Sequence, residues 1–372
     1  MFKTAMASLV LVNNPVEWIT GTDQQWQILN TLGIKITQRL QLKKMSLSVL
    51  IVGVFGNAES VQLSANGKTI FTSKFQSSKF FSENTWVGQT RTVDLALLNV
   101  DDVFEGSFSL RDTIQRVVFV GLAQKEKKPE ENGQIFDLTS QYSSSASENS
   151  DFVALNQVLR GQIEKVVEAA KKDKKSPEAK LVVYLEDFDG HLQAAAEGAA
   201  LGNWKFELDT EKFLTAQFGK DGFLLNGIKI VPGASESDFK RGIVYGSSQL
   251  FSRYLIELPA NYLTPTKYCQ LIKEKIEKYS LFASSEFISS KVQVLVHDEA
   301  WAQEKKMGSF LSVTAGTSEP AKVLELIFTN NSTKKADEYD LALLGKGITF
   351  DSGGISLKPG EGMKEMKGDM GG

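Results

Sequence analysis

Short apolar runs rich in β-branched residues alternate with helix-patterned segments in the first half of this chain. The runs 46–55 and 116–122 each carry a glycine, as buried strands often do. Between residues 153 and 167 the apolar side chains recur at helical spacing, and this segment leads into another apolar run at 181–185. A chain that alternates strands with helices in this way is expected to form an α/β layered fold.

A second group of elements follows an alanine-rich segment at residues 191–201. Alanine has the best helix propensity, so we expect a helix here that connects two domains. A long helix is expected at 237–258, where Pro259 stops it, and another begins after Thr264 with Pro265 in its first turn. Strands are expected in three further runs, at 292–296, 323–328 and 341–344.

The predicted architecture is an α/β chain of two domains. An N-terminal α/β domain at residues 45–190 is joined by a helix to a mixed-sheet α/β domain at residues 191–372. Residues 1–44 are an unassigned extension, because the first convincing strand opens at Met45. The stretch 124–150 is rich in Lys, Glu and Ser, and we expect a surface loop there.

The charge balance argues against nucleic-acid and membrane surfaces as partners. The 42 Lys and Arg residues nearly offset the 45 Asp and Glu residues, which leaves a formal charge of -3. No stretch reaches the roughly 18 consecutive apolar residues that a membrane-spanning helix needs. Small neutral or peptidic partners therefore fit better. We expect a cytoplasmic protein, and residues 1–44 give only weak support to a mitochondrial location.

Cysteine and histidine are scarce, which limits the kinds of metal site that the chain can build. Cys269 is the single cysteine, so an intramolecular disulfide and a Cys-rich zinc module are both excluded. This cysteine follows the apolar rhythm of a helix and is expected to be a packing residue. The two histidines, His191 and His297, lie outside any ligand cluster. A metal ion would therefore be held mainly by carboxylates, carbonyls, water or an unusual amine.

A glycine-rich stretch at residues 345–371 has the composition of half a metal site. Lys346, Asp351, Lys358 and Asp369 are interleaved with eight glycines. The two aspartates are separated by 18 positions, and they converge only if the glycines between them let the chain fold back. One bridging carboxylate can hold two divalent ions, as in two-metal hydrolases. The competing interpretation is that these residues form tight turns in which aspartate caps backbone amides and lysine faces solvent.

The same stretch resembles the signature of the leucine aminopeptidase family, also called cytosol aminopeptidases. That signature is a lysine, an aspartate five residues later, a lysine seven further and an aspartate eleven further, and all four positions match here. Similar segments occur at 194–202, 257–265 and 308–313. The resemblance covers about residues 191–372 well and residues 45–190 only loosely.

The resemblance implies a two-metal exopeptidase that removes N-terminal residues, preferably leucine-like ones, from peptides. Lys346 and Asp369 would be metal ligands, Asp351 would bridge two divalent ions, and Lys358 would be the catalytic lysine that binds substrate and stabilises the oxyanion. Met366 would line the side-chain pocket. The ions would be zinc, manganese or magnesium, and the family's assembly implies a homohexamer.

One departure from the family pattern leaves alternatives open. Family members carry a later acidic segment, Asn-Thr-Asp-Ala-Glu-Gly-Arg, which completes both metal sites, and this sequence does not contain it. We therefore expect an incomplete catalytic domain that binds metal weakly and catalyses little as it stands. The alternative is a catalytically inactive binding or assembly subunit of the same fold. A DNA-binding regulator is a third alternative, to which the charge of -3 gives little support.

Overall fold

The computed structural model describes the chain from residue 46 onward, with gaps. The described residues are 46–57, 60–82, 86, 89–106, 108–122, 149–173, 180–218, 227–278, 292–328, 339 and 341–371. The internal contacts divide the chain into two compact units. The first unit comprises residues 1–195 and 227–236, and the second comprises residues 196–226 and 237–372. The predicted domain limits are not tested by this division and stay a prediction.

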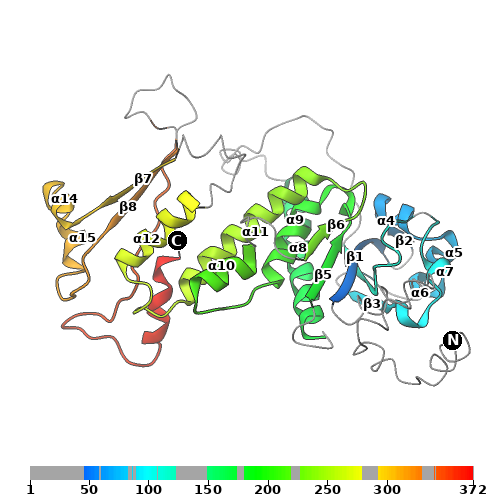
Figure 1. Ribbon diagram of the computed structural model, residues 1–372, viewed down its shortest axis with the longest axis horizontal. Helices are drawn as coiled ribbons and strands as arrows, with labels where there is room; N and C mark the ends of the chain where they lie inside the picture. The colour runs from blue at the N-terminus through cyan, green and yellow to red at the C-terminus, as the bar shows by residue number, and fades with distance from the viewer. Residues whose placement is uncertain are drawn as a thin grey trace, which may run out of the picture. The chain divides into compact units, whose positions relative to one another are not determined.

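A six-stranded mixed sheet forms the centre of the first unit, in the order β3-β4-β1-β5-β6, with β2 paired to β1 (Figure 1). β4, β1, β5 and β6 run parallel, whereas β3 and β2 are antiparallel to their partners. The strands are β1 Ser46–Asn57, β2 Ser60–Leu63, β3 Thr90–Asp94, β4 Arg116–Leu122, β5 Lys180–Leu185 and β6 Ile228–Ile230. This mixed sheet with its helices confirms the predicted α/β fold class.

The first unit also contains one long helix and several short ones. They are α4 Ala65–Ile70, α5 Ser73–Gln76, α6 Lys79–Ser82, η1 Leu95–Leu97, α7 Val100–Val103, α8 Asn149–Lys172 and η3 Phe188–Gly190. The short helices begin at side-chain caps: the hydroxyl of Ser64 accepts a hydrogen bond from Gly67 N in α4, and that of Thr72 does so from Phe75 N in α5. α8 and the strands β1, β4 and β5 match the segments that the sequence predicted.

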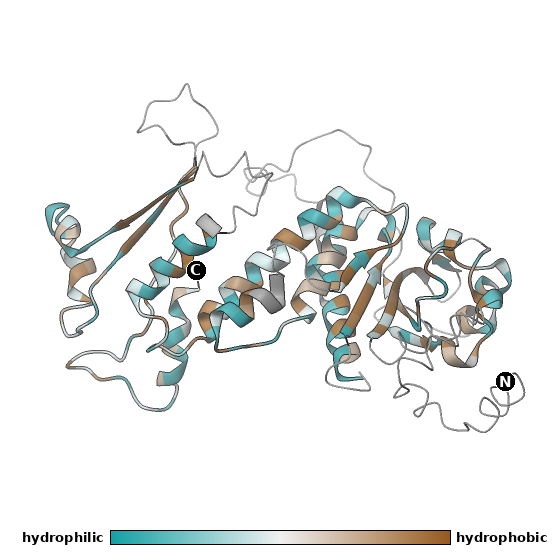
Figure 2. Ribbon diagram, in the orientation of Figure 1, coloured by the Kyte–Doolittle hydropathy of each residue, from teal (hydrophilic) through white to brown (hydrophobic). Residues whose placement is uncertain are grey.

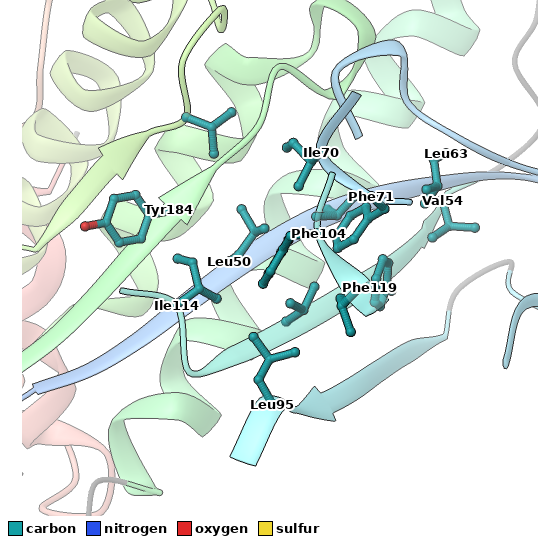
Figure 3. Packing of buried hydrophobic residues seen from close by; sticks show 14 of the residues in the cluster. Leu50, Val54, Leu63, Ile70, Phe71, Leu95, Phe104, Ile114, Phe119 and Tyr184 are labelled. Carbon is teal, nitrogen blue, oxygen red and sulfur yellow. The ribbon is translucent and has the colours of Figure 1, made fainter. Parts of the chain in front are cut away.

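Strand β1 is buried on both faces, which explains its continuous apolar sequence. Leu50, Val52 and Val54 point into a cluster that also contains Phe71, Phe104 and Phe119, and Figure 3 shows most of these side chains together. The rings of Phe71 and Phe104 stack with their centroids 5.6 Å apart. α8 packs against β1, β4 and β5 with buried residues that follow its helical spacing, namely Leu159, Ile163 and Val167.

Helix α9, Leu192–Gly202, carries the chain from the first unit to the second. The further elements of the second unit are α10 Thr210–Phe218, α11 Glu236–Glu257, α12 Pro265–Lys278, β7 Val292–His297, α14 Glu299–Glu304, α15 Gly308–Ser312, β8 Val323–Phe328 and η4 Met363–Met370. Among the described residues, no helix is long and apolar enough to cross a membrane.

A compact apolar cluster holds α10, α11 and the segment after α11 together. Phe213 of α10 stacks on Tyr254 of α11 with ring centroids 3.9 Å apart, and the Tyr254 hydroxyl lies 2.7 Å from Thr210 Oγ1. Leu258, Leu263 and other buried residues complete this cluster, which also includes Met370 of η4. The cluster therefore fixes η4, the element that follows the glycine-rich loop, against the end of α11.

β7 and β8 form an antiparallel pair that carries mostly apolar side chains, and Figure 2 shows most of both strands in the hydrophobic colour. The predicted strand at 341–344 is wrong: these residues form no regular element, and Leu343 and Leu344 are 87% and 98% exposed. An apolar run becomes a strand only with a ladder partner, and no described strand pairs with this one. The expected loop at 124–150 and the extension 1–44 lie almost wholly outside the described residues.

Candidate metal and substrate site

A tight loop from Asp351 to Lys358 forms the centre of the candidate site. Asp351 Oδ1 accepts a hydrogen bond from Gly353 N at 2.9 Å, and Lys358 N donates to Ser352 O at 2.9 Å. Gly353 adopts φ +90°, and a Cβ atom there would overlap the carbonyl oxygen of Ser356. The backbone thus turns back on itself, as the glycine content predicted, and brings both ends of the loop together.

The lysine at the end of this loop lies against the aspartate at its start. Lys358 Nζ is 2.7 Å from Asp351 Oδ2 and 3.2 Å from Met366 Sδ. The hydrogen bond from Lys358 is the main cause that holds the pKa of Asp351 below its ordinary range, and the backbone N–H of Gly353 and the charge of Lys346 act in the same direction. The carboxylate of Asp351 is therefore held in its ionised form, which is the form that a metal ligand needs.

A second lysine and aspartate pair lies in the same part of the chain. Lys346 Nζ is 3.3 Å from Asp369 Oδ2, across 23 residues of sequence. Asp369 sits on η4, which Gly362 begins with φ 77°, a left-handed conformation that favours glycine. Because the charge of Lys346 also acts on Asp351, the two pairs are electrostatically connected. The structure thus brings together all five residues that the sequence singled out.

The donor set of this site fits a divalent cation. Asp351 and Asp369 are each about one-third exposed, and each attracts an ammonium group to within 3.3 Å. Within the described part of the chain, no three Cys, His, Asp or Glu side chains converge, so a third protein ligand here would be the amine of Lys346. An amine binds metal only as the neutral form. Lys346, Asp351 and Asp369 would then hold the ion, with Lys358 beside them.

Contacts that the sequence did not reveal attach the site to helix α11. Lys367 Nζ donates to the carbonyl oxygen of Glu257, the last residue of α11, at 2.7 Å, and lies 3.5 Å from its Oε2. Met370 is 2% exposed in the cluster around α11. A lysine that binds a backbone carbonyl leaves no pattern in the sequence, so no motif could have indicated it.

The cysteine and the histidines lie outside this arrangement. Cys269 is buried in α12, which confirms the packing role, and its burial raises the pKa of the thiol. His297 lies 2.9 Å from Glu325 Oε2 and stacks on Trp301, with ring centroids 4.0 Å apart. His191 Nδ1 lies 2.9 Å from Asn156 Oδ1. The described contacts of both histidines are with protein groups.

The structure thus places two carboxylates, each paired with a lysine, on and beside one glycine-rich loop. Residues 250–372 match the cytosol aminopeptidase family, catalytic domain. This segment contains the whole candidate site, so the site lies in the part of the chain that is similar to that catalytic domain.

Two cytosol aminopeptidases are similar to the same half of the chain. The cytosol aminopeptidase of Dictyostelium discoideum is 41% identical over 187 residues, and that of Bos taurus is 37% identical over 183 residues. Each alignment covers 49% of this chain but only 33% and 31% of the relative. The matched part of the chain thus corresponds to about a third of the relatives' length.

A solved structure shares the fold. The leucyl aminopeptidase from Leishmania major, solved in complex with actinonin, aligns with a TM-score of 0.52 and 18% sequence identity. The alignment covers 89% of this chain and 54% of that protein. At this identity the likeness shows the fold alone.

Proposed function

We propose that the native protein is a metal-dependent aminopeptidase that releases N-terminal residues from peptides, with leucine-like side chains preferred. The observation that carries the proposal is the convergence of Lys346, Asp351, Lys358 and Asp369, whose side chains form two connected lysine and aspartate pairs. The similarity of residues 250–372 to the catalytic domain of the cytosol aminopeptidase family supports the same reaction class.

In the proposed site Lys346, Asp351 and Asp369 would hold the metal ions, and Asp351 would contribute to both metal positions. When bound, two divalent ions supply a water activated near neutral pH and polarise the scissile carbonyl. Following the family resemblance, we assign the ions to zinc, manganese or magnesium, and carboxylate ligands suit hard and borderline cations of this kind. An ionised Asp351 is ready for this role, since Lys358 and Gly353 already stabilise its negative charge.

Lys358 is the proposed catalytic residue. Its ammonium group is held 2.7 Å from Asp351 and therefore beside the proposed ions, where the oxygen of a substrate carbonyl would gain negative charge. A fixed cation at that point stabilises the oxyanion in the transition state. Met366 contacts the same lysine through its sulfur and presents an apolar surface for the substrate side chain. We further propose a homohexamer located in the cytoplasm, following the family resemblance.

The proposal is tested with the native full-length protein and two forms of one leucyl peptide. With Mn²⁺ present, a peptide with a free N-terminal amine should lose leucine, whereas its N-acetylated form should remain intact. Removal of metal by chelation should abolish the release, and Asp351→Asn should do the same. Glu361→Gln changes an exposed acid of the same glycine-rich stretch and serves as the control. Equal cleavage of both peptides, or none in the metal-loaded native protein, would refute the proposal, and the latter would favour an inactive binding subunit.

A further inference from the structure

The 3-10 helix η4 carries both Asp369 and Met366, so its position determines where two of the proposed site residues lie. Met370, at its end, is buried in the cluster around α11. Gly368 and Gly371 approach Ile256 of α11 closely: a Cβ atom on Gly371 would lie 2.6 Å from Ile256 Cδ1. η4 therefore packs directly on the last turn of α11, and a side chain on Gly371 would have to displace the end of the Ile256 side chain.

Lys367 adds the polar contact to this packing. Its ammonium group donates to the carbonyl oxygen of Glu257 at 2.7 Å, and the side chain is 27% exposed. The last carbonyl groups of a helix have no partner within the helix, and the negative end of the helix dipole attracts a cation. The carboxylate of Glu257 lies further away, at 3.5 Å, so the shorter contact is with the backbone.

We propose that Lys367 is a positioning residue, which attaches η4 to the C-terminal end of α11 and thereby holds Asp369 at the metal site. Lys367 and Asp369 are two residues apart on one short helix, so a shift at the first is passed on to the second. The Asp369 carboxylate lies 3.3 Å from Lys346, and loss of the anchor would move it away from that partner. This inference rests on the proposed function, because it takes Asp369 as a ligand.

The test compares Lys367→Met with Lys364→Met in the native protein. Lys364 lies on the same helix, but its side chain is 85% exposed, and within the described part of the chain it pairs only with its neighbour Glu365, at 3.8 Å. Loss of a group that supports a metal ligand typically weakens binding about 10-fold to 100-fold. We expect Lys367→Met to weaken Mn²⁺ binding about 10-fold by titration calorimetry. Lys364→Met should match the wild type, and Lys367→Arg should recover most of the affinity.

A second measurement needs neither metal nor activity. In the metal-free protein, amide hydrogen exchange of residues 363–371 should become faster in Lys367→Met and remain unchanged in Lys364→Met. Unchanged exchange together with unchanged Mn²⁺ affinity in Lys367→Met would overturn the inference. A wild type that binds no Mn²⁺ would refute the proposed function instead, while the exchange measurement would still report on the anchor.

A further variant keeps the test decisive if Lys367→Met does not fold. Glu257→Gln removes the distant charge but leaves the backbone carbonyl, so both exchange and Mn²⁺ affinity should stay close to those of the wild type. A loss in Glu257→Gln would show that the carboxylate, rather than the helix end, holds Lys367. That result would overturn the proposed anchor.

Discussion

We predict that Glu186→Gln removes a pH-dependent loss of stability from the first unit. Glu186 is fully buried, and its carboxylate accepts hydrogen bonds from Gly53 N and Phe188 N, both at 2.9 Å. Burial is the dominant effect and raises the pKa of this carboxyl from its ordinary 4.5 to about 7, although these backbone donors and Ser64 oppose the rise. The folded protein thus keeps a proton that the unfolded chain releases.

The sign and size of the effect follow from the two pKa values. Because the folded-state pKa is the higher one, the folded protein binds more protons between pH 4.5 and about 7, and its stability falls as the pH rises through this window. Each pKa unit corresponds to 1.36 kcal/mol, so stability should fall by about 2 to 3 kcal/mol between roughly pH 5 and pH 8. Glutamine carries no titrating proton and should abolish this contribution.

Urea unfolding at both pH values, read by hydrogen exchange in peptides from β1 and β5, measures the first unit alone. The difference in unfolding free energy between wild type and Glu186→Gln should change by about 2 to 3 kcal/mol across the window, in favour of the variant at high pH. Glu105→Gln, which removes an exposed carboxylate of the same unit, should follow the wild type. An identical pH dependence in Glu186→Gln and wild type would refute the reasoning.

Three further predictions concern the candidate site. Lys358→Ala in the native protein should lower kcat about 10²-fold to 10³-fold and leave the metal content nearly intact. Lys346→Ala should reduce the metal content, as measured by elemental analysis. Equal metal loss in both variants would contradict these roles. Gly353→Ala should destabilise the second unit by about 1 to 3 kcal/mol in thermal unfolding, because an alanine backbone is strained at φ +90°. An unchanged melting temperature would contradict the loop geometry. Met366→Ala should reduce kcat/KM for leucyl peptides about tenfold but that for alanyl peptides little, and equal losses would exclude a pocket role.

The sequence predicted the buried elements of the fold better than the small ones. Runs such as 46–55 and 116–122 are apolar throughout because both faces of a parallel strand are covered, and this pattern is visible without a structure. The helices α4 and α5 are only six and four residues long, too short for a periodic pattern, and depend on side-chain caps. The run 341–344 is apolar and so predicted a strand, but the sequence does not show whether a partner strand lies beside it, and none of the described strands pairs with it.

The sequence predicted the part of the candidate site that depends on the spacing of residues along the chain. The four motif residues were found because their spacing is fixed within 24 positions and matches a known signature. The contacts that support them depend on tertiary structure: Lys367 binds a main-chain carbonyl 110 residues away, and Glu186 binds main-chain amides. Nearly every residue has these backbone groups, so the sequence does not indicate which of them a side chain will bind.

The measurement that tests the central claim most directly is Mn²⁺ binding to the native protein, compared between wild type and Asp351→Asn. The claim is that Lys346, Asp351 and Asp369 hold the ions, with Asp351 shared between them. Titration calorimetry should show Mn²⁺ bound by the wild type and nearly all binding lost in Asp351→Asn, while circular dichroism shows the variant folded. Retention of the wild-type stoichiometry and affinity in folded Asp351→Asn would contradict the account.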